Sequence, residues 1–226
     1  MNGIDKYNSI VVKIEFSTLT RPDGTLDPVR MERMAMILSN LHNSGKQLLL
    51  VTSGAIALGT LKLKLQKPPA GLIEQQATAA VGQAELIKIY QSYFEIFNQR
   101  VAQVLLTSDI VDHPERKQNA LNTFNTLFEM NIIPVINEND AVSTEDIEFM
   151  DNYPLTLNVA RMSGSKLIII RGNEEGKYYL LNRGNSQARK IESEESLIKE
   201  VEESMKHFDE INDQDQFPEK MDEVIL

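Results

Sequence analysis

Five short, mainly apolar runs limit what this chain can fold into more than any other feature of its sequence. These runs are residues 9–14, 47–52, 101–106, 132–136 and 166–171. Such runs are typical of buried strands that are covered on both faces, as in a parallel sheet beneath helices. Between the runs, apolar residues recur at helical spacing. The alternation predicts an α/β fold in which right-handed crossovers place helices on both faces of a mostly parallel sheet.

The segments between the apolar runs are helical in pattern, and the chain reads as one domain rather than two. Their expected ranges are 28–43, 74–98, 114–130, 155–163 and 193–208, of which 74–98 is long enough for one helix or two. We find no internal repeat and no linker within the 226 residues. We therefore expect a single domain over residues 1–208, followed by an acidic, loosely ordered tail over residues 209–226.

The composition argues for a cytoplasmic protein. The sequence contains no cysteine, which excludes disulfides and thiolate metal sites and fits a reducing compartment. The first residues, MNGIDKYNS, lack the basic and apolar regions of a signal peptide. No apolar run approaches the ~20 residues that a membrane-spanning helix needs. We expect no membrane as a partner.

The net charge of −10 comes entirely from the end of the chain. Residues 1–190 hold 20 basic and 20 acidic side chains, whereas residues 191–226 hold 3 and 13. The acidic end would repel nucleic acid and anionic lipid, and the balanced remainder attracts neither. We therefore expect no nucleic-acid partner.

A polar cluster follows the apolar run 132–136. It consists of Asn137, Glu138, Asn139 and Asp140. Open α/β sheets bind their ligands at the carboxyl ends of their strands, so this cluster is a candidate ligand site. The alternative is a simple turn, because Asn and Asp are common turn residues.

A second candidate site follows the run 47–52, where Ser53, Gly54 and Ala55 lead into a new helical pattern. The start of a helix presents free backbone N–H groups and a positive dipole end, which together bind phosphate or carboxylate. The alternative is structural, since Gly54 would also relieve crowding between the helix and the strand.

Five motifs together resemble the glutamate 5-kinase branch of the amino acid kinase family, in the order and spacing of that family. They are Val12-Lys13, VTSGAIALG at 51–59, AAVGQ at 79–83, INENDAV at 136–142 and FMDN at 149–152. The resemblance implies a three-layer αβα sandwich, truncated at the C-terminus. It also implies transfer of the γ-phosphate of ATP, with Mg2+, to the side-chain carboxylate of L-glutamate, the first step of proline biosynthesis.

The resemblance also implies roles for individual residues. Lys13 and Lys220 would be catalytic, and Lys13 with Ser17 would contact ATP. Four residues would bind glutamate, namely Ser53, Gly54, Asp140 and Asn152. Among these, Asp140 is the natural partner of the α-ammonium group. No residue is assigned to a metal. For Lys13 the alternative is a solubilising lysine on an edge strand.

Several positions depart from the pattern of the family on the nucleotide side. Glu15 and Phe16 replace a glycine and a small hydroxyl residue, and Tyr153 replaces an acid. Arg171-Gly172 replaces Thr-Asp, and the segment before Lys220 lacks the expected glycines. A carboxylate at position 15 that lay ~4–5 Å from a triphosphate would cost ~3–4 kcal/mol per charge at an effective dielectric constant of 20.

Two functions remain open at this stage. The first is a glutamate 5-kinase homologue in which phosphotransfer from ATP is weakened. The second is a pseudokinase that binds glutamate and regulates or scaffolds an active paralogue. The pairing of the NEND and DN motifs argues against carbamate, aspartate or acetylglutamate as the acceptor. A sheet without its last strands exposes an edge, so we expect a homo-oligomer or a hetero-oligomer with a paralogue.

Overall fold

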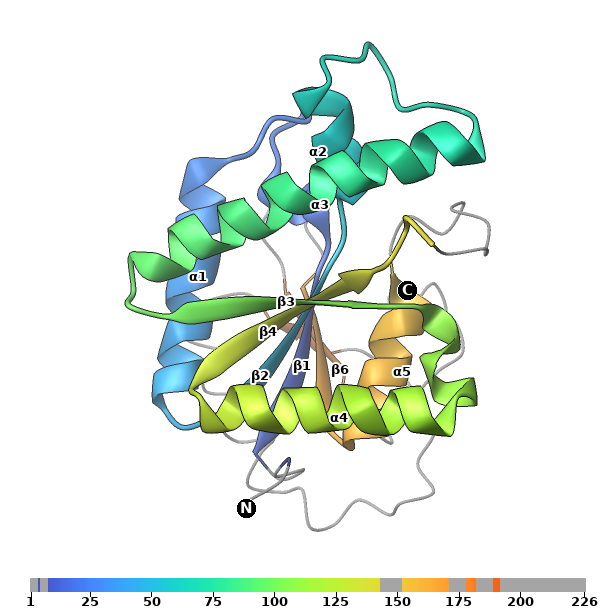
Figure 1. Cartoon of the computed structure of the whole chain (residues 1–226). Coiled ribbons are helices and arrows are strands. Elements are labelled where there is room, and N and C mark those ends of the chain that lie inside the picture. Colours follow the sequence, from blue (N-terminus) through green and yellow to red (C-terminus); the bar gives the residue numbers. More distant parts are fainter. Residues whose placement is uncertain (1–3, 5–7, 143–151, 171–177, 182–188, 192–226) are drawn as a thin grey trace.

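A sheet of seven described strands runs through the middle of the structure (Figure 1). This computed structural model describes residues 4, 8–142, 152–170, 178–181 and 189–191, and the last two ranges and residues 166–170 are described by their backbone alone. The strand order is β3-β4-β2-β1-β5-β6-β7. The strands are β1 (Ser9–Ile14), β2 (Gln47–Thr52), β3 (Arg100–Leu106), β4 (Ile132–Glu138), β5 (Lys166–Ile170), β6 (Tyr178–Leu181) and β7 (Arg189–Ile191). The first five in this order are parallel, whereas β6 and β7 pair antiparallel, which confirms a mostly parallel sheet.

Helices cover both faces of the sheet (Figure 1). The described helices are α1 (Pro28–Asn43), α2 (Ala55–Lys62), α3 (Leu72–Glu95), α4 (Pro114–Glu129) and α5 (Tyr153–Ser163). Two short 3-10 helices, η1 (Phe16–Leu19) and η2 (Ser108–Asp112), follow β1 and β3. The long segment expected over 74–98 is one helix, α3. The helix expected over 193–208 and the tail over 209–226 lie outside the described residues.

Two separate apolar cores confirm the three-layer architecture. On one face, Ile10 and Val12 of β1 pack with Leu38 of α1 and Tyr90 of α3. On the other face, the intervening Val11 packs with residues of α4 and α5. Side chains of a strand alternate between the two faces of a sheet, so each mainly apolar run supplies both cores at once.

The strand expected to be buried over 101–106 is instead the edge strand of the described sheet. β3 pairs with β4 on one side and ends the strand order on the other. Consequently Leu106 is the buried residue of β3, while Arg100 and Gln103 are exposed. The prediction of a strand was right and the prediction of its burial was wrong, because position in the sheet depends on strand order and not on local composition.

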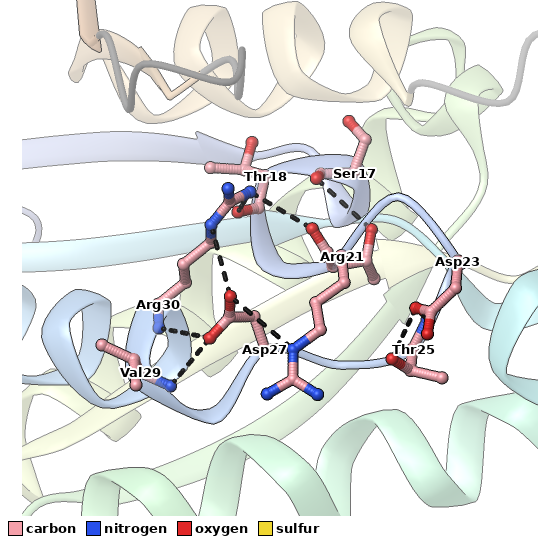
Figure 2. A network of polar contacts seen from close by, with 9 residues as sticks. Ser17, Thr18, Arg21, Asp23, Thr25, Asp27, Val29 and Arg30 are labelled. Atoms are coloured by element: carbon pink, nitrogen blue, oxygen red, sulfur yellow. Dashed lines mark hydrogen bonds and ion pairs between the residues drawn. The ribbon is translucent and has the colours of Figure 1, made fainter.

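A polar network joins the start of α1 to η1 (Figure 2). The Asp27 carboxylate accepts hydrogen bonds from the backbone N–H groups of Val29 and Arg30 at 3.0 and 3.4 Å, which caps α1. Such a cap typically contributes ~1 kcal/mol. The Arg30 guanidinium donates to the carbonyl oxygens of Thr18 and Thr20 at 3.5 and 3.2 Å. The network therefore holds the turn that follows β1 in a defined place.

Candidate active site

The predicted site residues that the structure describes lie near the carboxyl ends of three neighbouring strands. Lys13 of β1 pairs with Val51 of β2, and Val51 pairs with Ile136 of β4. The segments that follow these strands therefore leave the same edge of the sheet. They carry Ser53 and Gly54 after β2, and Asp140 after β4.

Lys13 is a buried lysine whose ammonium group lies between a carboxylate and an aromatic ring. Its side chain is 1% exposed, and its Nζ lies 3.4 Å from Oε1 of Glu15. The same Nζ lies 5.8 Å from the centroid of the Tyr153 ring, within the range of a cation–π contact. Burial of a charged group requires such partners. The alternative of a solubilising edge-strand lysine is wrong, because β1 lies between β2 and β5.

Ser53 and Gly54 pack against the turn after β1. The backbone N–H of Phe16 donates to Oγ of Ser53 at 3.3 Å. Gly54 has a φ of +103°, and a Cβ at this position would lie 2.3 Å from Cγ of the Phe16 ring. Gly54 is thus required both by its backbone conformation and by the close approach of Phe16. The crowding that it relieves comes from the turn after β1.

Asn152 ties three elements together at the start of α5. Its Nδ2 donates to the carbonyl oxygen of Thr52 at 2.8 Å and to Oδ1 of Asn137. Its own carbonyl oxygen accepts from the backbone N–H and the hydroxyl of Thr156, at 3.0 and 2.6 Å. Asn152 adopts a left-handed conformation with a φ of 51°, which asparagine tolerates better than most residues. Asn152 therefore lies beside the residue that precedes Ser53.

The NEND cluster divides into a strand end and a turn. Asn137 and Glu138 are the last residues of β4 and are buried, so the turn alternative is wrong for these two. The Glu138 carboxylate accepts from the backbone N–H of Ser108 at 3.1 Å and from its hydroxyl at 2.8 Å. Asp140 lies in the turn that follows. Glu138 therefore joins β4 to η2, and Asp140 extends beyond the sheet.

Asp140 is a partly buried carboxyl group with an altered acidity. Burial raises its pKa from 3.8 to about 6, and a hydrogen bond from the Gln83 side chain opposes that rise. Removal from water disfavours the charged form of a carboxyl group. A cation that binds beside such a carboxyl group strongly stabilises its ionised form, which suits the ammonium group of a substrate.

Comparison with known proteins identifies the family. The sequence profile of the amino acid kinase family matches residues 8–208. A glutamate 5-kinase of Enterococcus faecalis is 38% identical over 206 residues, which are 89% of this chain and 73% of that protein. The chain belongs to the amino acid kinase family, in its glutamate 5-kinase branch. A glutamate 5-kinase of Clostridium perfringens is 40% identical over 198 residues, which are 86% of this chain and 74% of that protein.

Solved structures of the amino acid kinase fold support the architecture. The UMP kinase of Bacillus anthracis has a TM-score of 0.51 and 15% identity, over 80% of this chain and 72% of its own. The carbamate kinase of Giardia has a TM-score of 0.52 and 13% identity, over 73% of this chain and 72% of its own. At these identities the likeness shows the fold alone. No described helix is long and apolar enough to cross a membrane.

The nucleotide side of the family pattern is only partly visible in the described chain. Ser17 lies exposed in η1, close in sequence to Lys13. Lys220 and Gly172 lie outside the described residues. Within the ranges that the structure describes, no three His, Asp or Glu side chains cluster as a metal site. The positive charge of Lys13 attracts a phosphate group, whereas the negative charge of the adjacent Glu15 repels it.

Three residues with a structural part in this site have no individual role in the sequence-based prediction. Asn137 accepts from Asn152, Ser108 donates to Glu138, and Gln83 donates to the carbonyl oxygen of Glu138 at 3.1 Å. Gln83 ends the AAVGQ motif and Asn137 begins NEND. Gln83 and Asn137 could therefore have been predicted from the sequence, because each belongs to one of these motifs. Ser108 has no such signal, because it lies between motifs.

Proposed function

We propose that this chain binds L-glutamate and acts as a glutamate 5-kinase-like phosphotransferase with a weakened ATP step. The observation that carries the proposal is the contrast within one site. The residues expected to bind glutamate are present and supported by a hydrogen-bond network, whereas the lysine expected to contact phosphate is already paired with Glu15. The names of the relatives support glutamate as the substrate.

In this proposal each substrate group has a partner on the chain. The Asp140 carboxylate binds the α-ammonium group, and the Ser53 hydroxyl binds a carboxylate oxygen of glutamate. Both N–H groups of Asn152 Nδ2 already donate to Thr52 and Asn137, so Asn152 offers its Oδ1 to the ammonium group. Backbone N–H groups at the start of α2 also favour an anion there. These contacts orient the side-chain carboxylate toward Lys13. Holding reactants in a productive geometry is a main source of rate in phosphoryl transfer, which requires no covalent protein nucleophile.

The reaction joins an oxygen of the glutamate side chain to the terminal phosphorus of ATP and breaks the bond to ADP. ATP with Mg2+ supplies the phosphoryl group, and glutamyl phosphate and ADP are the products. Lys13 neutralises charge on the transferred group, and Lys220 is its second catalytic partner by resemblance. Electrostatic stabilisation of this kind is the largest contribution that a protein makes to such a reaction.

Glu15 is the residue that weakens the ATP step in this proposal. Its carboxylate lies 3.4 Å from Nζ of Lys13, and its side chain is 15% exposed. A phosphate that approached Lys13 would have to displace this carboxylate or bind beside a like charge. Like charges ~4–5 Å apart repel by ~3–4 kcal/mol at an effective dielectric constant of 20, which corresponds to two to three orders of magnitude.

Replacement of Glu15 should therefore strengthen the ATP step. We expect Glu15→Gly to raise the affinity for Mg-ATP at least ~10-fold and to raise turnover, because the competing charge is removed. Glu15→Gln should give part of this gain. Turnover is measured as glutamyl hydroxamate formed with hydroxylamine, with Lys13→Ala as the blank. Glu95→Gln on the exposed side of α3 is the matched control and should change nothing.

A pseudokinase is the second candidate function, and one observation favours it. Glu15 and Tyr153, two of the departures from the family, both lie against Lys13. In this case the chain binds glutamate and serves as a regulatory or scaffolding subunit of an active paralogue. Calorimetric binding of glutamate without turnover, in the wild type and in Glu15→Gly alike, would exclude the first function and support this one.

Glutamate binding should depend on pH through Asp140. The ionised carboxylate is the form that binds an ammonium group, and its pKa in the unliganded protein is about 6. Binding is therefore full above pH 7 and is lost as the pH falls through 6. We expect the Kd for glutamate to be about tenfold higher at pH 5 than at pH 7.5, measured by calorimetry. A Kd that stays constant over this range would exclude Asp140 as the ammonium partner.

A further inference from the structure

The end of β2 is held by two buried hydroxyl groups, one of which comes from α3. The Tyr90 hydroxyl lies 2.8 Å from Oγ1 of Thr52, and the same Oγ1 donates to the carbonyl oxygen of Ser53 at 3.3 Å. The side chains of Tyr90 and Thr52 are both 1% exposed. Tyr90 lies on α3 and Thr52 ends β2, so the two bonds join a helix to the residue that begins the turn of the candidate site.

The direction of these hydrogen bonds follows from the donors that are present. The Thr52 hydroxyl carries one hydrogen, and the carbonyl oxygen of Ser53 can only accept. If Thr52 donates to Ser53, the Tyr90 hydroxyl donates to Thr52 and both hydrogens are used. If Thr52 donated to Tyr90 instead, the hydrogen of the buried Tyr90 hydroxyl would have no acceptor among the contacts of the described residues. Buried polar groups are rarely left without a partner, so the chain runs from Tyr90 through Thr52 to Ser53.

This chain sets the plane of the peptide group between Ser53 and Gly54. A trans peptide group directs its carbonyl oxygen and its N–H to opposite sides, and the described residues contain no cis peptide bond. Because Thr52 holds the carbonyl oxygen, the N–H of Gly54 faces away from Tyr90. Gly54 has a φ of +103° and no side chain, so its backbone rotates freely unless a hydrogen bond holds it.

The peptide groups on either side have partners of their own. The carbonyl oxygen of Thr52 accepts from Nδ2 of Asn152 at 2.8 Å. The carbonyl oxygen of Gly54 accepts from the N–H of Leu58 at 2.9 Å, which is the first hydrogen bond of α2. Loss of the Thr52 hydroxyl would therefore release the middle peptide group and leave its two neighbours held.

We propose that Tyr90 and Thr52 are positioning residues for substrate binding: they hold the peptide group that precedes Gly54 so that its N–H meets a carboxylate of the bound amino acid. This inference rests on the proposed function, because it takes the start of α2 as the place where that carboxylate binds. Tyr90 and Thr52 do not themselves touch the substrate. A hydrogen bond weakens steeply when its donor points away from the acceptor, so the orientation of this peptide group decides what the N–H contributes to affinity.

The orientation of the peptide group is measured by nuclear magnetic resonance on the full chain. Cell-free synthesis with carbonyl-labelled serine and nitrogen-labelled glycine gives signals from Ser-Gly pairs, of which the sequence contains three, ending in Gly45, Gly54 and Gly164. Thr52→Val and Tyr90→Phe should each shift the Gly54 signal. Gly45 and Gly164 precede the starts of β2 and β5, at the opposite edge of the sheet, and their signals should stay in place. Thr52→Ser keeps the hydroxyl and should keep the Gly54 signal near its wild-type position.

The labelling also provides its own assignment. Ser53→Ala removes the labelled carbonyl group that precedes Gly54, so the signal that disappears in this variant is that of Gly54. An unchanged Gly54 signal in both Thr52→Val and Tyr90→Phe would overturn the inference. An equal shift of all three signals would overturn it too, because the two hydroxyl groups would then support the fold in general and not this peptide group.

Binding of L-glutamate, measured by calorimetry at pH 7.5, shows whether the orientation matters to the substrate. Loss of a hydrogen bond to a carboxylate weakens binding about tenfold, and this is the rise in Kd expected for Thr52→Val. Tyr90→Phe should raise the Kd by about threefold, because Thr52 keeps its own hydrogen bond to Ser53. The double variant should match Thr52→Val, because Tyr90 acts through Thr52. Tyr90→Phe removes a single oxygen atom, so it tests the inference even where Thr52→Val does not fold.

Thr60→Val and Tyr93→Phe are the matched controls. Thr60 of α2 is also buried and donates to a backbone carbonyl oxygen, that of Ile56 at 2.7 Å, and Tyr93 is a partly buried tyrosine of α3. Both variants should bind glutamate as the wild type does. An unchanged Kd in Thr52→Val, with a shifted Gly54 signal, would overturn the inference while the proposed function stands. Absence of binding by the wild type would overturn the proposed function, and the inference with it.

Discussion

Asp140→Asn should abolish glutamate binding and at the same time make the unliganded protein more stable. Removal of one partner of a buried charge pair costs 2–5 kcal/mol, so we expect the Kd to rise at least ~30-fold. The gain in stability has a separate cause. Because the folded protein raises the pKa of Asp140 from 3.8 to about 6, the ionised carboxylate opposes folding at neutral pH.

The sign of the stability effect follows from that shift. The contribution of Asp140 to stability is greatest below pH ~3, where the carboxyl group is protonated in both states, and it is lost as the pH rises from about 4 through 6. Asparagine does not titrate. The free energy of unfolding of Asp140→Asn should therefore exceed that of the wild type by about 1–3 kcal/mol at pH 7.5 and by almost nothing near pH ~3.

Calorimetry and thermal unfolding at the two pH values check both effects. Asp109→Asn is the control with the opposite sign, because hydrogen bonds from Thr107 and His113 lower the pKa of Asp109. That variant should lose stability at neutral pH and keep its affinity for glutamate. Loss of stability in Asp140→Asn would contradict this explanation, because the carboxylate would then stabilise the folded protein rather than destabilise it.

Gly82→Ala should destabilise the protein severely. A Cβ at Gly82 would lie 1.7 Å from the carbonyl oxygen of Ala55 and 2.6 Å from the backbone nitrogen of Gly59. Both are backbone atoms of α2, so no side chain can rotate away. We expect a loss of at least ~3 kcal/mol in the free energy of unfolding, a large part of the 5–15 kcal/mol typical of a domain.

Gly71→Ala is the matched control for this prediction, measured by urea unfolding of both variants. Its Cβ would meet Oε2 of Glu74 at 2.1 Å, the far end of a flexible side chain that can move. A change within ~1 kcal/mol is expected there. An equally mild effect of Gly82→Ala would show that α2 and α3 separate readily, and that the position of Gln83 on α3 is not rigidly maintained.

Local sequence patterns were sufficient to predict most of the elements. The runs in β1, β2 and β4 are apolar on both faces, and this property is readable without knowing their neighbours. β3 shows the limit, because its composition matches a buried strand, while its place at the end of the strand order leaves Arg100 and Gln103 exposed and only Leu106 buried. The expected roles of Ser53, Gly54, Asp140 and Asn152 came from resemblance and remain predictions, as do those of Lys13, Ser17 and Lys220.

The sequence by itself determined the α/β class, the family and the residues that reach the carboxyl edge of the sheet, because these follow from local periodicity and from motifs. The tertiary structure alone decided which of those residues are partners. The pairing of Lys13 with the ring of Tyr153, and the link from Gln103 through Gln83 to the carbonyl oxygen of Glu138, join residues from separate elements. Such contacts depend on strand order and helix packing, which bring distant segments together and which no local pattern encodes.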